Sequence, residues 1–212
     1  IEYLSKYIQN NPVDAIISSS PPQSDHLIAH SLAKKFNIPW IADFRDPWTQ
    51  VDYFDQLKLS NRAKKRHQEM EAGVLKNANI VLTVSPSWAK DFKQLGATKV
   101  EVITNGYDEE DFPEGNISKD DTFTLAHIGN ISKDRCHDNL FKALSKLVSE
   151  KEDFSKKLKI KLAGSVDAAF LNKAREYNLE KNIDRLGMLS HEEAIEEMCS
   201  AQALLLLLGS KN

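Results

Sequence analysis

The chain has 212 residues, enough for one large domain or two small domains that each bury a core. Hydrophobic residues make up 41% of it, charged residues 28%, and the formal net charge is −3, a composition typical of globular proteins without overall attraction to nucleic acid. The two cysteines, Cys136 and Cys199, lack ligand spacing, which argues against a disulfide scaffold or a zinc ribbon. Neither a signal peptide nor an apolar run long enough to cross a bilayer occurs, so we expect a cytoplasmic protein.

In the first half of the chain, short β-type runs alternate with amphipathic stretches, which predicts a parallel sheet built from βαβ units. The predicted helices are residues 1–9, 24–36, 59–76 and 86–95, and the predicted strands are residues 15–19, 40–44, 80–84 and 100–103. Pro86 after Ser85 marks a helix start, because proline at the first helical position gives up an amide that would be unpaired anyway.

The second half repeats this alternation after a linker, residues 105–121, that is rich in Gly, Pro, Asn and acidic residues. The predicted strands are residues 123–128, 158–163, 183–186 and 203–208, and the predicted helices are residues 139–150, 167–177 and 191–201. Ser190 and Glu193 form a capping-box pattern that opens the last helix. The prediction is therefore an α/β protein with two domains, residues 1–111 and 112–212, each a parallel sheet flanked by helices.

Charged residues follow the predicted strand 40–44 in the run IPWIADFRDPWT. Asp43, Arg45 and Asp46 stand where ligands bind in wound α/β sheets, in the crevice outside the carboxyl ends of the strands. This position makes them candidates for a functional site. The alternative is a structural turn in which Arg45 pairs with its neighbouring carboxylates.

A second candidate site follows the predicted strand 123–128, where Gly129 precedes a helix by about ten residues. Such an arrangement suits a phosphate, because glycine lets the backbone approach closely and the helix start offers unpaired amides. Lys133 and Arg135 can supply neutralising charge, although solvated basic residues in an ordinary loop are the alternative. Neither GxGxxG nor GxxxxGK[ST] occurs, so a dinucleotide fingerprint and a triphosphatase loop lack support.

Two further features have structural explanations. His26 and His30 stand four apart on a predicted helix, but the glutamate of an HExxH zinc motif is absent, so helix packing is favoured. The basic stretch 58–76 is interrupted by Glu69 and Glu71, and a solvated helix face is favoured over a membrane-surface patch.

Several runs match one known family in order and spacing: SSSPPQSDHLIAHSLAKKFNIPWIADFRDPW, NANIVLTVSPSWAKDF, VITNGYDEEDF, HIGNISKDR, LAGS and RLGMLSHEEAIEEMCSAQALLLLL. They resemble the nucleotide-sugar glycosyltransferases of GT-B architecture, in particular the retaining family four enzymes of bacterial surface-polysaccharide synthesis. The resemblance implies two Rossmann-like domains, both incomplete here, with the acceptor on the first and the donor on the second. It also implies that the reaction occurs in the cleft between them, with Asp43 and Arg45 on its wall.

The resemblance implies a set of donor-binding residues: Gly129 and Asn130 at the diphosphate, Lys133 or Arg135 as neutralising charge, Gly164 and Ser165 in the next strand-end loop, and Met188 and Leu189 near the base. Many relatives have an arginine at the position of Asn130, a lysine at Cys136 and a histidine at Arg45. Arginine cannot serve as a base at ordinary pH, so Arg45 would act electrostatically or position the acceptor, and Asp43 and Asp46 become the candidates for the acceptor hydroxyl.

Sugar transfer of this kind chiefly needs positive charge and amide donors at the leaving diphosphate, and the family precedent uses neither a metal nor another cofactor. The expected partners are a nucleotide-sugar donor and a glycan or lipid-linked acceptor, with peripheral contact at the inner face of the membrane as an option. Two alternatives remain, a sugar-nucleotide epimerase of the same architecture and a non-catalytic nucleotide-sugar-binding module. A glycosidase fits less well, because Asp43 and Asp46 share one loop.

The relatives carry an acceptor-side glycine-rich loop upstream and a pair of donor-binding glutamates downstream that this chain lacks. We therefore expect an internal fragment whose 212 residues bind the donor weakly and transfer no sugar, because diphosphate contacts alone do not orient both substrates.

Overall fold

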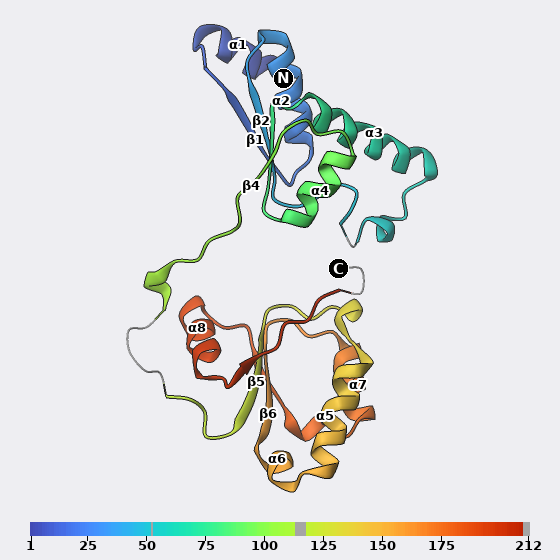
Figure 1. Ribbon diagram of the computed structural model, residues 1–212, viewed down its shortest axis with the longest axis vertical. Helices are drawn as coiled ribbons and strands as arrows, with labels where there is room; N and C mark the ends of the chain where they lie inside the picture. The colour runs from blue at the N-terminus through green and yellow to red at the C-terminus, as the bar shows by residue number, and fades with distance from the viewer. Residues whose placement is uncertain (52, 113–117, 210–212) are drawn as a thin grey trace. The chain divides into compact units, whose positions relative to one another are not determined.

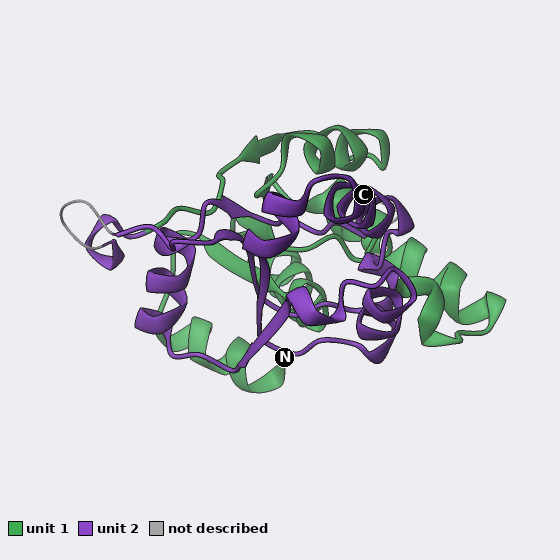
Figure 2. Cartoon of the chain, turned by 90° about the horizontal axis from the view of Figure 1, so that it is seen from below, with its two compact units in different colours: residues 1–107 green, residues 108–212 purple. Residues whose placement is uncertain are grey.

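The computed structural model describes residues 1–51, 53–112 and 118–209. They form two compact units, Ile1–Tyr107 and Asp108–Asn212 (Figure 2). Each unit holds a four-stranded parallel sheet flanked by helices, which confirms the predicted α/β class with two Rossmann-like domains. The change of unit falls within the predicted linker, of which residues 113–117 lie outside the described part of the chain.

The first unit places its strands in chain order across the sheet (Figure 1). The strands are β1 (Ile16–Ser20), β2 (Trp40–Phe44), β3 (Ile80–Thr83) and β4 (Val100–Val102), and the helices are α1 (Glu2–Asn10), α2 (Ser24–Phe36), α3 (Asn61–Asn77) and α4 (Pro86–Gln94). Because successive right-handed crossovers run in one direction, α2, α3 and α4 cover the same face. The ranges of α2 and β2 agree with prediction, and the other elements differ by one or two residues.

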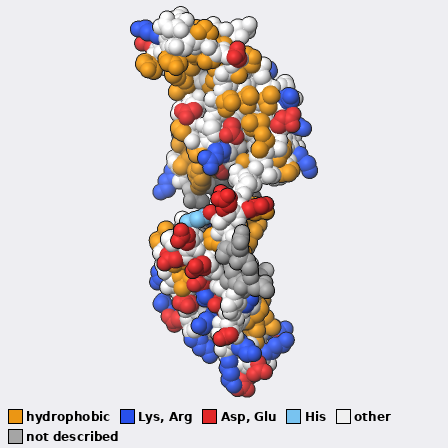
Figure 3. Space-filling model, turned by 90° about the vertical axis from the view of Figure 1, so that its left-hand side faces the viewer, with side chains coloured by type: hydrophobic (Ala, Val, Ile, Leu, Met, Phe, Trp, Pro, Cys, Tyr) orange, Lys and Arg blue, Asp and Glu red, His pale blue; other side chains and the backbone are white. Residues whose placement is uncertain are grey.

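The helix-covered face of this sheet forms the core of the first unit. Trp40, Ala42 and Phe44 alternate into it from β2 and are at most 1% exposed. The helices contribute Ala29 and Ala33 from α2, Val74 and Leu75 from α3, and Ala89 and Phe92 from α4. The opposite face is more open, since Ile17 is 68% exposed, and Figure 3 shows hydrophobic side chains over much of the visible surface of this unit. Asp43 belongs to this open face, because side chains alternate along a strand.

The second unit has the strand order β7-β6-β5-β8. Its strands are β5 (Phe123–Ile128), β6 (Leu158–Ala163), β7 (Ile183–Gly187) and β8 (Ala203–Leu204), and its helices are α5 (Asp138–Glu150), α6 (Glu152–Lys157), α7 (Ala168–Glu176) and α8 (His191–Ser200). The chain returns across the sheet between β7 and β8, so α8 covers the face opposite α5 and α7 (Figure 1). This reversal creates a topological switch point between β5 and β8, the place where open α/β sheets bind ligands.

One predicted strand of the second unit is too long. Residues 203–208 were expected as a strand, but β8 is only Ala203–Leu204, paired with Leu125 and Ala126. The alternation of buried and exposed residues that suggested the longer strand continues to Leu208, although the strand does not. Where the ladder stops, the carbonyl of Leu205 accepts a hydrogen bond from the His127 imidazole.

The other elements of this unit agree with prediction within one residue, and the capping box of Ser190 and Glu193 is present. Helix α6 was not predicted, because six residues are too few to show a helical period.

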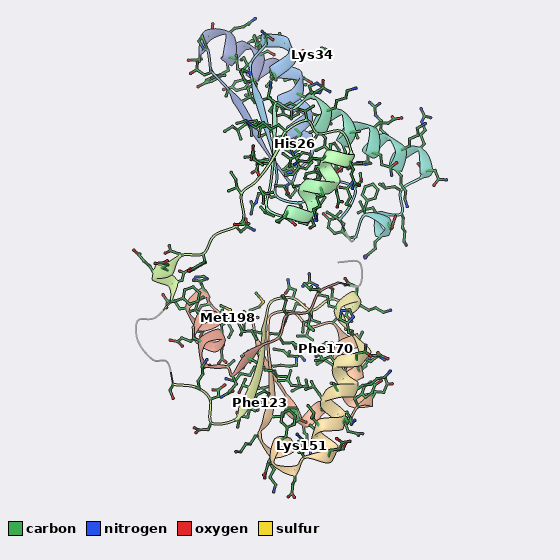
Figure 4. All side chains as sticks on the ribbon, in the orientation of Figure 1. His26, Lys34, Phe123, Lys151, Phe170 and Met198 are labelled. Carbon is green, nitrogen blue, oxygen red and sulfur yellow. The ribbon has the colours of Figure 1, made fainter. Side chains whose placement is uncertain are left out.

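His26, in the first turn of α2, is fully buried against the sheet (Figure 4). Its ring lies 4.4 Å from that of Phe44, and its Nδ1 lies 2.7 Å from Ser18 Oγ, which also accepts a hydrogen bond from the Trp40 indole. Burial lowers the pKa of His26 to about 4, although the nearby carboxylates of Asp43 and Asp25 oppose this shift. The residue therefore packs as a neutral imidazole, as the helix-packing interpretation predicted.

We expect the buried imidazole to make stability depend on pH. Between pH 6.5 and about 4, the unfolded chain binds a proton at His26 that the folded chain excludes, so the free energy of unfolding falls as pH falls through this window. The loss should reach up to about 3 kcal/mol at the lower end. Urea denaturation at pH 7, 6 and 5 measures it, and His26→Gln should show a shallower slope. Equal slopes in the two proteins would contradict this assignment.

Candidate functional site

Backbone hydrogen bonds connect the carboxyl ends of β5 and β6 and the loops that follow them. The amide of Gly129 donates to Ala163 O at 2.9 Å, and the amide of Ile131 donates to Ser165 O at 2.8 Å, so the chain after β5 continues beside the loop after β6. Gly129 and Gly164 have φ angles of +139° and +106°, and a Cβ on Gly164 would lie 2.5 Å from the carbonyl oxygen of Gly129. Only glycine fits at Gly164 without displacing this backbone.

Asn130 sits at the centre of this junction. Its side-chain Oδ1 accepts a hydrogen bond from the amide of Ser165 at 3.1 Å, and its carbonyl oxygen lies 3.4 Å from a guanidinium nitrogen of Arg135. Its own amide has no hydrogen-bond partner among the described residues. The Asn130 amide is therefore a free donor at the carboxyl end of β5, the strand beside the switch point.

The start of α5 adds a second set of donors beside this amide. His137 occupies the N-cap position, and no side chain caps the helix. The Leu140 amide donates to the His137 carbonyl at 3.1 Å, whereas the amides of Asp138 and Asn139 have no partner among the described residues and are available to a ligand. The carboxylate of Asp138 in the first turn would repel an anion, but it pairs with Lys173 at 2.7 Å, which lowers the pKa of Asp138. A short 3₁₀ turn, Lys133–Arg135, places Arg135 between Gly129 and the helix.

The structure brings most of the predicted donor-binding residues to one end of the sheet: Gly129, Asn130, Arg135, Gly164 and Ser165. Lys133 lies in the same turn and is exposed. Met188 and Leu189 follow β7, next to β6 and on the side away from the switch point, and Met188 is 82% exposed. The roles assigned to these residues stay predictions.

In the first unit, the predicted charged residues lie at the end of β2 and just beyond it. Asp43 accepts a hydrogen bond from Ser19 Oγ, at the end of neighbouring β1, at 2.7 Å. Arg45 and Asp46 are exposed, and no ion pair joins Arg45 to Asp43 or Asp46, all of which are described. The turn is therefore not held by pairing among its own charges.

The side chain that holds this turn is Glu71 of α3, which is 2% exposed. Its carboxylate accepts hydrogen bonds from the amides of Trp48 and Thr49, at 3.2 and 3.4 Å, and from the side chains of Thr49 and Gln50. The interpretation of Glu71 as part of a solvated face was wrong. Spacing could have revealed it, because Glu71 precedes the buried Val74 and Leu75 by three and four positions and so shares their helix face.

Residues 1–111, just over half of the chain, match the family described as Glycosyltransferase Family 4. This chain belongs to that family. No curated protein sequence matches it.

Several solved structures share the fold of this family 4 chain. Sucrose-phosphate synthase from Thermosynechococcus elongatus matches with a TM-score of 0.65 and 16% identity over 96% of this chain and 52% of its own. The lipopolysaccharide outer core galactosyltransferase WaaB matches with a TM-score of 0.62 and 15% identity, over 97% of this chain and 53% of its own. TarM of S. aureus matches with a TM-score of 0.58 and 14% identity, over 94% of this chain and 38% of its own. These likenesses show the GT-B architecture, and the chain spans about half or less of each structure.

The described residues of the family 4 chain hold neither a cluster of metal-ligand side chains nor a membrane-spanning helix. Within residues 1–51, 53–112 and 118–209, no three His, Cys, Asp or Glu side chains gather closely enough to hold a metal ion. Transfer without a metal or another cofactor stays a prediction. None of the helices in the same ranges is long and apolar enough to cross a membrane.

We expect Gly164→Ala to destabilise the second unit strongly. The new Cβ would meet Gly129 O at 2.5 Å in a backbone conformation that side chains disfavour, so the loss should be about 3 kcal/mol or more. Gly187→Ala is the matched control, because Gly187 also has a positive φ but open space around it, and it should lose only about 1 to 2 kcal/mol. Urea denaturation measures both, and equal losses would refute the steric argument.

Proposed function

We propose that this chain carries part of the active site of a glycosyltransferase that moves a sugar from a nucleotide-sugar donor to a glycan or lipid-linked acceptor. The observation that supports this most directly is the open anion-binding corner at the β5–β8 switch point. There the free amide of Asn130, the uncapped start of α5 and Arg135 come together. Membership of Glycosyltransferase Family 4 supports the same reaction class.

The chemistry of the donor explains why such a corner is useful. Breaking the bond between the anomeric carbon and the diphosphate places negative charge on a leaving oxygen, and fixed donors stabilise that charge without reorganising. The Asn130 amide and the first amides of α5 are fixed by backbone structure, and the half-buried Arg135 already lies against the Asn130 carbonyl. The diphosphate would therefore bind to hydrogen-bond donors that are already in position.

The first unit would supply groups for the acceptor. Asp43 is oriented by Ser19 and can accept a hydrogen bond from an acceptor hydroxyl, while Arg45 is free to attract negative charge. The guanidinium stays protonated at ordinary pH, so Arg45 acts by charge and Asp43 and Asp46 remain the proton-accepting candidates. Glu71 keeps the following turn in one conformation, which would hold these groups in place.

The similar structures suggest which substrates to test first. TarM was solved in complex with UDP, and WaaB acts in the outer core of lipopolysaccharide, as their titles state. We therefore propose a uridine nucleotide sugar and a surface-polysaccharide acceptor, with the protein meeting a lipid-linked acceptor at the inner face of the membrane.

Incubation of this chain, and of a version extended at both ends, with UDP-sugars tests the reaction class when it is done with and without a glycan acceptor. Transfer by the extended version that requires the acceptor supports the proposal. A changed sugar nucleotide that the extended version forms from the donor alone would instead indicate an epimerase, and donor binding by it with neither product would indicate a binding module.

We expect Arg135→Ala to weaken UDP binding about 10- to 100-fold, the effect of losing one charge-assisted hydrogen bond to phosphate. Arg175→Ala is the control, because this exposed arginine of α7 pairs with Glu180 away from the corner. Isothermal titration calorimetry measures both affinities. Unchanged affinity in Arg135→Ala would remove this residue from the donor site.

A further inference from the structure

The segment after β8, residues 205–208, forms one side of the switch point and has little regular support. Its last ladder contact is the hydrogen bond from the Leu205 amide to Ala126 O at 2.8 Å. Leu207 is 5% exposed and packs into the core, whereas Leu206 and Leu208 are 78% and 51% exposed. Core packing of Leu207 and side-chain hydrogen bonds, rather than strand pairing, therefore hold this segment beside β5.

Two histidines from the β5 side hold it at both ends. His127 of β5 places Nδ1 2.8 Å from Leu205 O, and His137, the N-cap of α5, places Nε2 2.6 Å from Leu208 O. Carbonyl oxygens only accept hydrogen bonds, so the hydrogen of each ring is on the nitrogen that faces the segment. The tautomers are thus opposite, Nδ1–H in His127 and Nε2–H in His137.

His127 also contacts the other side of the corner. The ring is 6% exposed, and its Nε2 lies 3.7 Å from the point that a Cβ on Gly129 would occupy. This nitrogen is buried and has no hydrogen-bond partner among the described residues. The imidazole of His127 therefore contacts both Gly129, in the loop after β5, and the segment after β8.

We propose that His127 and His137 are positioning residues that fix residues 205–208 as one wall of the nucleotide-sugar site. The opposite wall is the loop after β5, which carries Asn130. This inference rests on the function proposed above and names residues that the donor-site assignment left out. Neither histidine needs to touch the donor. They act by setting the distance between the free Asn130 amide on one wall and the backbone of residues 205–208 on the other.

The sharpest test uses His137, because it is exposed and its loss should leave the core intact. His137→Ala removes the hydrogen bond to Leu208, whereas His137→Gln keeps an N–H donor at similar reach. His191→Ala, at an exposed histidine of α8, is the control. The measurements are the amide NMR spectrum of the free chain, its melting temperature and its affinity for UDP.

We expect His137→Ala to shift the amide signals of Gly129, Asn130 and residues 205–208, to leave the melting temperature nearly unchanged and to weaken UDP binding about five- to tenfold. His137→Gln should restore both the signals and the affinity. Imidazole ¹⁵N spectra should show the opposite tautomers of His127 and His137.

Two results would overturn the inference: unchanged Gly129 and Asn130 signals in His137→Ala, or no recovery in His137→Gln. If the unaltered chain binds no UDP, GDP or ADP, the proposed function fails. The amide NMR signals of the ligand-free chain still test separately whether a change at His137 alters both residues 205–208 and the loop that carries Gly129 and Asn130.

Discussion

The backbone contact between Gly129 and Gly164 is the constraint on which the second unit's candidate site depends. Because Gly164 has no side chain, the loop after β6 can approach the Gly129 carbonyl. The amide of Gly129 then donates to Ala163 at the end of β6, and the amide of Ile131 donates to Ser165 in the loop. Those two amides are used on the β6 side, whereas the Asn130 amide between them has no partner among the described residues and is left to a ligand.

In the first unit, the loop after a strand is held in place by a buried carboxylate instead of by a close approach at glycine. The turn after β2 has several polar groups that must be satisfied near the core, and the carboxylate of Glu71 accepts hydrogen bonds from the backbone and side chains of residues 48–50. A buried carboxylate is tolerated only when it is hydrogen-bonded this fully. Since Glu71 holds the turn, the charges of Arg45 and Asp46 are not needed for its structure and remain exposed.

Most of the architecture could be predicted from local patterns, because α2, β2, β5 and β6 each carry the full period of their element and end at clear stop residues. Contacts between distant segments could not. The burial of Glu71 needs the turn after β2 as its partner, and the hydrogen bond of His127 beyond the end of β8 joins residues 78 positions apart. The glycines of the donor corner were identified as strand-end residues, but the contact between Gly129 and Gly164 depends on strand order, which one-dimensional periodicity does not contain.

Strand order also bears on how a donor would lie across the second unit. The anion-binding corner lies at the β5–β8 switch point, whereas Met188 and Leu189, the residues predicted to lie near the base, follow β7. Two inter-strand spacings separate β5 from β7, about 10 Å. A nucleotide that reached from one to the other would cross the end of β6 directly above Gly164 and Ser165. A side chain at Gly164 would then disturb both the packing beneath the ligand and its path, so one small residue serves the fold and the proposed site together.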